Sequence, residues 1–452
     1  MNGVFRPLYG AAGQVARLAA AVAPAGDGKL TRTLRARRGI RRRYEAWGAS
    51  GRDAERPLLW MHAPSVGEGL QARPVLELAR RARPDLQLAY TFFSPSAEAF
   101  ARSLDVDFAE YLPFDTGGDA AAALDALRPA ALVFSKLDVW PRLVEVAAAR
   151  GVRLGLASAT MSAASSRGGP FARLALRDAY ARLHAVGAIS EDDAARLAAL
   201  GVARSRIRVT GDTRYDQAWR RAERVDRASA LLAPLADPRF TLVAGSTWPA
   251  DEAPLLEAWL AVRRQNAHAR LVIAPHEPTP EHLAPIERWA QTNRLPLIRL
   301  SQSTDAGAHG ADVVLVDRVG VLGDLYALGS AAFVGGGFHA AGLHSVLEPA
   351  AFGLPVCFGP QHASSRDAGL LIAAGGAVTA GTPRVLAEQL RRWMTSEALR
   401  THAGTAARDV VRAGLGADTR TWALIEGLLG RAHAAGGATD SAGAAGAAVA
   451  EG

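Results

Sequence analysis

The stretch AFVGGGFHAAGLHSVLEPAAFGLPVCFGP, residues 332–360, decides the fold class. It starts with an apolar run that ends in three glycines, continues through a loop and an alanine-rich helical segment, and closes on a second apolar run that ends in Gly-Pro. This order of strand, loop, helix and strand is typical of a parallel α/β unit. A ligand at the glycines would lie where a strand ends and a helix begins, which is where α/β proteins bind phosphate groups.

The same alternation of short β-rich runs with Ala-, Leu- and Arg-rich helical segments occurs in two series. The first comprises PLLWMHA (57–63), LQLAYTFF (86–93), ALVFSKL (131–137), VRLGLAS (152–158), HAVGAIS (184–190) and RIRVTGD (206–212), and the second FTLVAGS (240–246), RLVIAPH (270–276), VVLVD (313–317), AAFVGGG (331–337) and LPVCFG (354–359). Strands separated by helices form parallel sheets that are covered on both faces. We therefore expect an α/β protein of two doubly wound, Rossmann-like domains that face a cleft.

The length of 452 residues is sufficient for two compact domains. The expected parts are an N-terminal helix with a basic segment (1–50), a first Rossmann-like domain (51–216), a linker (217–236), a second Rossmann-like domain (237–431) and a low-complexity, disordered tail (432–452). The single cysteine, Cys357, lies within an apolar run and is expected in the core. One cysteine cannot form an intrachain disulfide, which fits a reducing location that faces the cytosol.

The formal net charge of +8 comes from one segment. Residues 29–43, KLTRTLRARRGIRRR, contain eight basic residues and no acidic residue. The remaining 44 basic residues equal the 44 acidic residues in number, so the rest of the chain is formally neutral. A nucleic-acid-binding protein usually spreads its basic side chains over a folded face, so we expect no nucleic-acid partner.

The segment before this basic block predicts a helix that lies on a membrane surface. Apolar residues recur at helical spacing between Phe5 and Val22, but Arg6, Gln14 and Arg17 interrupt them. The segment is too polar to span a bilayer, whereas an interfacial helix followed by basic residues suits an anionic membrane surface. A cleaved signal peptide is disfavoured, because the basic residues follow the apolar stretch. The alternative is a helix packed on the protein's own surface.

Nine segments, the opening stretch among them, occur in the order seen in the 3-deoxy-D-manno-octulosonic acid (Kdo) transferases. The other eight are SVGE (65–68), YTFFSPSA (90–97), YLPFD (111–115), DVWP (138–141), AISEDDAARLAALGV (188–202), RVTGDTRYD (208–216), AGSTWPADE (244–252) and DRVGVLGDLYALG (317–329). The chain resembles this family over roughly residues 4–425. The resemblance implies a glycosyltransferase of GT-B fold that needs no cofactor. Its first domain would bind a lipid A precursor and its second CMP-Kdo, at the cytoplasmic face of the inner membrane.

Three segments depart from the pattern of the family. Lys136 and Asp138 stand where many members have an acidic pair before Trp-Pro. PHEP (275–278) stands where many have Pro-Arg-His-Pro, and GLHS (342–345) stands where many have Gly-Gly-His-Asn. These departures are typical of a divergent branch, and they leave the donor and the acceptor less defined than the reaction.

Glu68 is the candidate general base. It follows the run LLWMHA in a Ser-Val-Gly turn, at the carboxyl end of an expected parallel strand, where ligands bind. There its carboxylate could accept the proton of an acceptor hydroxyl on the face opposite the leaving group, which would invert the anomeric carbon. Position alone equally allows Glu68 to cap the following helix, and the resemblance favours the base. Ser65, in the same turn, is placed among the acceptor-binding or charge-stabilising residues.

Lys136 is one of only two lysines among 52 basic residues. A lysine in the apolar run ALVFSKLDVW suggests that a compact point charge is needed there. It could contact the carboxylate or the phosphate of the donor, or it could form a structural ion pair with Asp138. The sequence does not separate these two roles.

The donor phosphate is expected at the glycines of the opening stretch. With no side chains, these glycines would let a ligand approach the backbone, and a helix that starts near Ser345 would direct its free N–H groups at the phosphate. The donor-binding candidates are Ser246, Thr247, His276, Gly335, Gly336, Gly337, His344, Ser345, Glu348 and Arg366. By resemblance, Glu348 matches the family's ligand for the nucleotide ribose.

Other functions are weaker interpretations of the same residues. His339, His344 and Glu348 lack the H-E-x-x-H pattern of a zinc site, and GGGFHAAG lacks the G-x-G-x-x-G spacing of a dinucleotide site. Two alternatives keep the fold: a transferase that uses a UDP-sugar, and a non-catalytic, membrane-associated nucleotide-binding scaffold. An intact Glu68 beside an intact glycine loop disfavours the scaffold.

Overall fold

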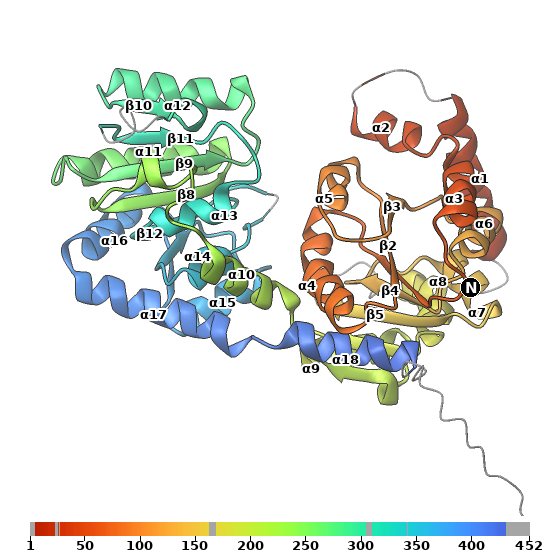
Figure 1. Cartoon of the computed structure of the whole chain (residues 1–452). Helices are drawn as coiled ribbons and strands as arrows, with labels where there is room; N and C mark the ends of the chain where they lie inside the picture. The colour runs from red at the N-terminus through yellow and green to blue at the C-terminus, as the bar shows by residue number, and fades with distance from the viewer. Residues whose placement is uncertain are drawn as a thin grey trace, which may run out of the picture.

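The structure is a computed structural model that describes residues 5–22, 26, 28–161, 169–303, 310–340 and 342–430. These residues form two parallel β-sheets of seven strands each, flanked by helices (Figure 1). The predicted fold of two doubly wound domains is confirmed. The tail at 432–452 lies outside the described residues.

The first sheet has the strand order β3-β2-β1-β4-β5-β6-β7. Its strands are β1 (Leu58–His62), β2 (Gln87–Phe92), β3 (Phe108–Tyr111), β4 (Ala131–Ser135), β5 (Arg153–Ala159), β6 (Ala185–Ala188) and β7 (Ile207–Val209). Its helices are α4 (Val66–Ala82), α5 (Glu98–Arg102), α6 (Gly117–Leu127), α7 (Pro141–Ala149), α8 (Pro170–Ala181) and α9 (Glu191–Leu200). The strand order reverses between β1 and β4, so the loops after these strands open onto one crevice, which we call the first switch point.

The second sheet has the order β10-β11-β9-β8-β12-β13-β14. Its strands are β8 (Thr241–Thr247), β9 (Arg270–Pro275), β10 (Leu297–Arg299), β11 (Val313–Leu315), β12 (Ala331–Val334), β13 (Val356–Phe358) and β14 (Ala377–Thr379). Its helices are α11 (Pro249–Arg263), α12 (Pro280–Thr292), α13 (Leu322–Leu325), α14 (Leu347–Ala351), α15 (Arg366–Ala373), α16 (Pro383–Thr395) and α17 (Glu397–Ala413). Here the order reverses between β8 and β12, and the loops after these strands form the second switch point.

Three strands, β3, β10 and β14, are missing from the sequence-based prediction. Each has three or four residues and lies at an edge of its sheet. Their residues are only partly buried, whereas β1, β2 and β4 are buried along their whole length. An edge strand therefore lacks the continuous apolar run by which a central parallel strand is recognised.

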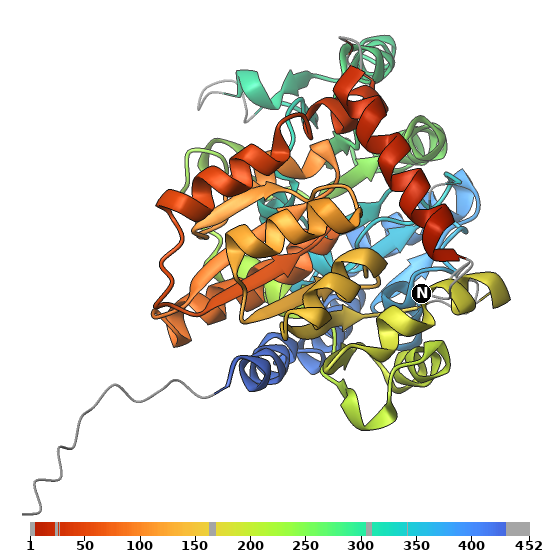
Figure 2. The same cartoon turned by 90° about the vertical axis from the view of Figure 1, so that its right-hand side faces the viewer.

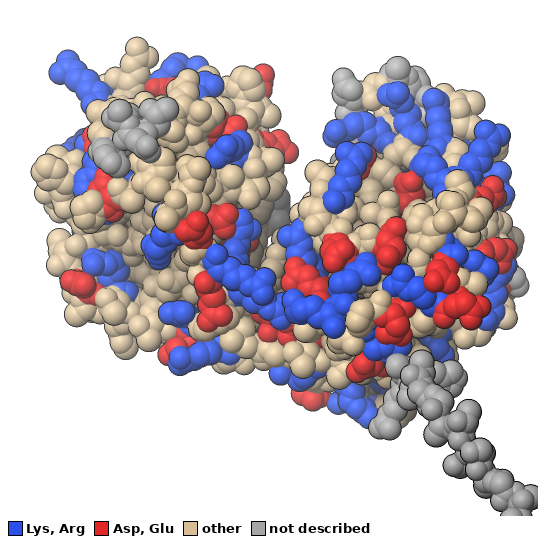
Figure 3. Space-filling view, in the orientation of Figure 1, with Lys and Arg blue, Asp and Glu red and all other residues tan. Residues whose placement is uncertain are grey.

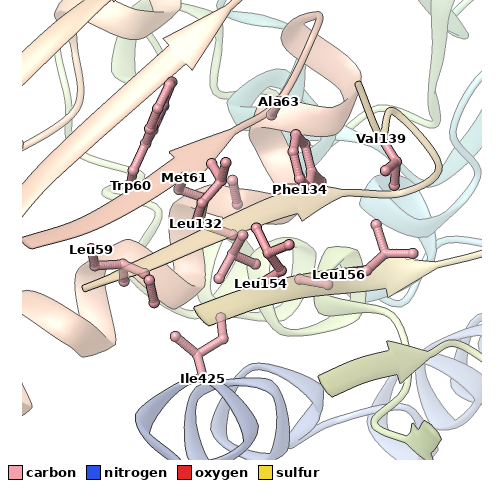
Figure 4. Packing of buried hydrophobic residues seen from close by; sticks show 14 of the residues in the cluster. Leu59, Trp60, Met61, Ala63, Leu132, Phe134, Val139, Leu154, Leu156 and Ile425 are labelled. Carbon is pink, nitrogen blue, oxygen red and sulfur yellow. The ribbon is translucent and has the colours of Figure 1, made fainter. Parts of the chain in front are cut away.

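The last helix, α18 (Ala417–Leu429), corrects the predicted end of the second domain at residue 431. Its buried residues Trp422, Ile425 and Leu428 belong to the core of the first sheet. Figure 4 shows Ile425 directed at the strands of that sheet. After α17 the chain thus returns to the first domain. The predicted linker, 217–236, begins inside α10 (Thr213–Arg224), a helix that packs against both α4 and α14.

Three helices, α1 (Phe5–Val22), α2 (Lys29–Arg35) and α3 (Ile40–Ser50), lie over the first domain, with α1 along its outer side (Figure 2). One face of α1 packs on the protein, since the Tyr9 hydroxyl donates a hydrogen bond of 2.8 Å to Asp115. The alternative of a helix on the protein's own surface is therefore correct for this face.

The outward side of α1 exposes apolar side chains beside the exposed Gln14 and Arg17. The side chains of Val15, Leu18 and Val22 are 65%, 68% and 80% exposed, and Leu30 of the neighbouring α2 is 72% exposed. Among the described residues, no helix combines the length and the hydropathy needed to cross a membrane.

The basic segment 29–43, which the sequence predicts to suit an anionic membrane surface, is partly structural. Arg37 is buried and donates hydrogen bonds to three backbone carbonyls. Arg41 forms an ion pair with Asp119, and Arg43 does so with Glu110. The exposed arginines of the segment are Arg32, Arg35, Arg38 and Arg42. In Figure 3, blue side chains gather over the part of the first domain where Figure 1 places α2 and α3.

Candidate functional site

A cavity of about 470 Å³ lies between the two domains, and Figure 3 shows the hollow that separates the two lobes. Its polar lining comprises Glu68, Gln71, Lys136, Thr160, Asp212, Arg214 and Gln217 on one side and His344, Ser345, Glu348, Ser364, Ser365, Arg366 and Asp367 on the other. Both switch points thus contribute side chains to one space. Its size is that of a small-molecule site.

Glu68 lies in the first turn of α4, directly after β1 and Ser65. The Ser65 hydroxyl donates a hydrogen bond to Oε2 of Glu68, and Nζ of Lys136 lies 3.2 Å from Oε1. Burial opposes ionisation of Glu68, but the hydrogen bond from Ser65 and the charge of Lys136 outweigh it and lower the pKa of the carboxyl group. The carboxyl group of Glu68 is therefore ionised at neutral pH. The Ser65 side chain makes no capping bond to the α4 backbone.

Lys136 follows β4 with a φ of +63°, a left-handed conformation that is unfavourable for a residue with a side chain. This backbone turn places its ammonium group beside Glu68 across the first switch point. Strained backbone of this kind persists where the surrounding structure fixes it, and it is frequent at functional sites. The partner found for Lys136 is Glu68, which the sequence did not suggest, and its predicted contact with the donor stays a prediction.

Asp138 instead belongs to a polar network beneath the first switch point and does not line the cavity. It accepts a hydrogen bond of 2.9 Å from the indole of Trp140, and Nε2 of His62 lies 3.2 Å from the same oxygen. Nδ1 of the fully buried His62 lies 3.0 Å from the Thr91 hydroxyl. Sequence reasoning missed His62, because its partners Thr91 and Asp138 lie far from it in the chain.

The glycines of the opening stretch have a structural reason that differs from the predicted one. A side chain on Gly335 would overlap the carbonyl group of Ser246, and one on Gly336 would overlap that of Gly342. A side chain on Gly337 would lie 2.4 to 3.0 Å from backbone atoms of Gly359, which is closer than packed atoms tolerate. The glycines thus let neighbouring backbone segments pack together. They do not line the cavity, and the predicted approach of a ligand to them stays a prediction.

Three other donor-binding candidates lie beside the cavity rather than in its lining. Ser246 adopts a φ of +54°, and the buried Thr247 hydroxyl donates a hydrogen bond of 2.9 Å to Glu252. The His276 ring lies 4.6 Å from the ring of Trp248. The His276 ring is exposed and also lies 4.5 Å from the ring of His344, which lines the cavity.

His344, Ser345, Glu348 and Arg366 line the cavity from the second domain. Helix α14 starts at Leu347 and has five residues, so the expected helix from Ser345 begins later and is short. Burial lowers the pKa of His344 to about 4, and the nearby His276 adds to this shift, so the imidazole is neutral. Burial also raises the pKa of Glu348, although Arg221 at 3.9 Å counteracts it.

Arg214 is a cavity residue that the sequence analysis did not single out. It donates hydrogen bonds to Asp212 at 2.6 Å and to Asp367 at 2.8 Å. The Tyr215 hydroxyl also donates to Asp367, at 2.9 Å. Because Asp367 belongs to α15 of the second domain and Asp212 follows β7 of the first, this network ties the two walls of the cavity together.

The described residues contain no group of three or more His, Cys, Asp or Glu side chains that could hold a metal ion. Cys357 is buried, and its thiol contacts the Ala332 carbonyl, as expected for a core residue.

A family profile described as "3-Deoxy-D-manno-octulosonic-acid transferase (kdotransferase)" matches residues 34–217. The chain is 32% identical over 400 residues to the 3-deoxy-D-manno-octulosonic acid transferase of Bordetella pertussis, covering 85% of this chain and 91% of that protein. The transferase of Haemophilus influenzae is 25% identical over 303 residues, covering 67% of this chain and 70% of that protein. A solved structure, a putative UDP-N-acetylglucosamine 2-epimerase from Listeria monocytogenes, has a TM-score of 0.59 at 15% identity, with 82% and 96% of the chains covered, and shows the shared fold alone.

Proposed function

Because the chain belongs to the 3-deoxy-D-manno-octulosonic acid (Kdo) transferase family, we propose that it moves Kdo from CMP-Kdo to a hydroxyl group of a lipid A precursor. It is a glycosyltransferase of GT-B fold. The observation that supports the assignment of roles is the position of Glu68, an ionised carboxylate in a cavity whose opposite wall contains His344, Ser345 and Glu348.

In the proposed reaction, Glu68 accepts the proton of the acceptor hydroxyl as its oxygen bonds to the anomeric carbon of Kdo. The bond between that carbon and the phosphate oxygen breaks, and CMP leaves with the electron pair. Attack from the side opposite CMP inverts the anomeric carbon. Lys136 holds Glu68 in place and contributes positive charge near the carboxylate of the sugar.

On the donor side, a neutral His344 and the Ser345 hydroxyl are hydrogen-bond donors for the phosphate. Glu348 accepts hydrogen bonds from the ribose hydroxyl groups, and Arg366, at the start of α15, contributes a positive charge. CMP-Kdo carries negative charge on its phosphate and on its carboxylate, so cationic and neutral hydrogen-bond donors of the protein suit it.

The acceptor is a lipid, which supports placing the protein at the cytoplasmic face of the inner membrane. The exposed apolar face of α1, with Leu18 and Val22, lies on the same domain as Glu68. Exposed arginines of α2 and α3 would attract anionic headgroups, each by about 1 kcal/mol. Apolar contact and charge together would hold the domain to an anionic membrane surface.

A donor and acceptor screen tests the reaction. Purified protein is incubated with a tetraacylated disaccharide lipid and either CMP-Kdo or a UDP-sugar, and the products are weighed by mass spectrometry. We expect the mass of one or more Kdo units only with CMP-Kdo. A product formed only from a UDP-sugar would show that the proposed donor is wrong. The absence of product with every donor would favour the non-catalytic scaffold.

Vesicle sedimentation tests the membrane contact. Replacing Leu18 and Val22 together by Ser should reduce sedimentation with anionic vesicles, and raising salt from 0.1 M to 1 M should release part of the unaltered protein, because the Debye length falls from about 10 Å to about 3 Å. The matched control replaces the exposed Val385 and Leu399 of the second domain by Ser. Full-length protein that stays in the supernatant at low salt would contradict the membrane proposal.

A further inference from the structure

Trp248 lies at the second switch point, as the N-cap residue of α11 directly after β8. Its backbone N–H donates a hydrogen bond of 3.0 Å to the carboxylate of Asp251. The same carboxylate accepts the N–H groups of Gly336 and Phe338 at 2.7 Å and 2.9 Å. Asp251 is fully buried, so this turn is fixed to the loop after β12. The backbone at Trp248, from which the indole extends, is therefore anchored to that loop.

The indole makes a directional contact with His344. Nε1 of Trp248 lies 3.0 Å from Nε2 of His344. Because an indole N–H can only donate, Nε2 has to accept, and a neutral His344 ring then carries its proton on Nδ1. Burial, His276 and His339 keep the ring neutral at physiological pH by lowering its pKa to about 4, against an opposite effect of Asp251.

The remaining ring nitrogen of His344 is available to a ligand. His344 lines the cavity, and within the described part of the chain its Nδ1 has no hydrogen-bond partner and is not among the buried unpaired atoms. A phosphate oxygen only accepts hydrogen bonds. The Nδ1–H tautomer would attract such an oxygen, whereas the other tautomer would present a lone pair to it.

We propose that Trp248 is a positioning residue for donor binding, which fixes His344 in the tautomer that presents Nδ1–H to the phosphate of a nucleoside monophosphate sugar. This inference rests on the proposed function and adds a residue to it. Trp248 itself does not line the cavity, so it acts through His344. Stacking restrains the indole plane, since the ring of His339 lies 4.6 Å away and only 10° from parallel.

The tautomer can be observed directly by nuclear magnetic resonance of full-length protein labelled with ¹⁵N at histidine. A His344→Ala variant assigns the signals of His344. In the unaltered protein we expect Nδ1 protonated and Nε2 unprotonated. Trp248→Phe, which keeps an aromatic ring but removes the N–H donor, should shift the population toward the Nε2–H form that neutral imidazole favours in water. Protonation on Nε2 in the unaltered protein would overturn the proposal without any variant.

The matched control is Trp289→Phe. Trp289 is half-buried on α12, packs on the core of the second sheet and lies outside the cavity lining. Its replacement should leave the His344 signals as they are. An equal change in this control would show that the tautomer responds to general loosening of the domain, and it would overturn the role of Trp248.

Calorimetric titration with CMP gives a second readout. Trp248→Phe should weaken CMP binding about threefold to tenfold, the effect of one hydrogen bond, and should have no further effect in a His344→Ala background. Additive losses in the double variant would mean that Trp248 acts structurally and would overturn the proposal. If the unaltered protein neither binds CMP nor transfers a sugar, the proposed function fails, while the tautomer measurement still decides whether Trp248 orients His344.

Discussion

The two switch points hold equivalent places in the two sheets, yet they differ in charge. At the first, Glu68 and Lys136 form an ion pair at 3.2 Å. At the second, a neutral His344 is bonded to the indole of Trp248. The first can accept a proton, and the second offers hydrogen-bond donors to an anion. One topology thus supports the two halves of a transfer reaction, because the side chains after the strands determine the chemistry.

The largest effect is expected on turnover, and it tests whether the first switch point accepts the proton while the second binds the donor. Glu68→Gln removes the proton acceptor but keeps the shape of the side chain, so turnover should fall by roughly two to four orders of magnitude while CMP affinity stays the same. The control, Glu77→Gln, lies later on the same helix. Initial rates of product formation and calorimetry with CMP measure the two quantities. Near-normal turnover in folded Glu68→Gln protein would remove Glu68 from the role of base.

The reverse pattern is expected at the second switch point. Glu348→Ala removes an acceptor for the ribose hydroxyl groups, a contact of about 1.5 to 3 kcal/mol, so CMP should bind about tenfold to a hundredfold more weakly. Glu348→Gln, which keeps a carbonyl oxygen, should lose less. Titration calorimetry with CMP compares these variants with Glu68→Gln. Unchanged CMP affinity in folded Glu348→Ala protein would make this glutamate structural.

The ion pair at the first switch point predicts a change in pH dependence. The hydrogen bond from Ser65 and the charge of Lys136 lower the pKa of Glu68 against the effect of burial. Lys136→Met removes the charge and so raises that pKa. Because the base works only when ionised, a raised pKa moves the acid limb of the pH–rate profile to higher pH. The profile of Arg264→Met, which removes an exposed cation of the second domain, should keep its acid limb. An unchanged acid limb in Lys136→Met would show that the charge of Lys136 does not set the pKa of the base.

The smallest effect concerns a feature that the switch points share. Lys136, directly after β4, and Ser246, at the irregular end of β8, both adopt a left-handed conformation, with φ of +63° and +54°. At each position the Gly variant should be more stable than the Ala variant by about 1 kcal/mol, because Ala strains this backbone and Gly does not. Denaturant unfolding measures the difference. At Glu388, an exposed position in α16, the order should reverse by about the same amount. A less stable Gly variant at Lys136 or Ser246 would contradict the assigned strain.

The burial of each strand determines whether the sequence predicts it. Central parallel strands such as β1 and β4 are buried on both faces and therefore appear as continuous apolar runs. The edge strands β3, β10 and β14 are partly exposed and give no such run. The amphipathic pattern of α18 predicts a helix, but it does not say which of two cores the helix covers, and α18 was placed in the wrong domain.

The site was predictable in its location and less so in its contacts. Glu68, Lys136, His344, Glu348 and Arg366 lie in the cavity, as expected from positions after strands, and their roles stay predictions. The partner of Lys136 and the packing of the glycines depend on backbone geometry, which one sequence does not reveal. The same limit applies to Trp248 and Arg214: both occur in motifs of the family resemblance, but their contacts His344 and Asp367 lie far away in the chain.

The anomeric configuration of the product tests the central claim most directly. If Glu68 at the first switch point activates the acceptor while the second switch point holds CMP, the sugar is transferred in one displacement. Nuclear magnetic resonance of the purified product, compared with the donor, should then show an inverted anomeric carbon. Retention of the donor's configuration would require an intermediate step and would contradict the division of roles between the two switch points.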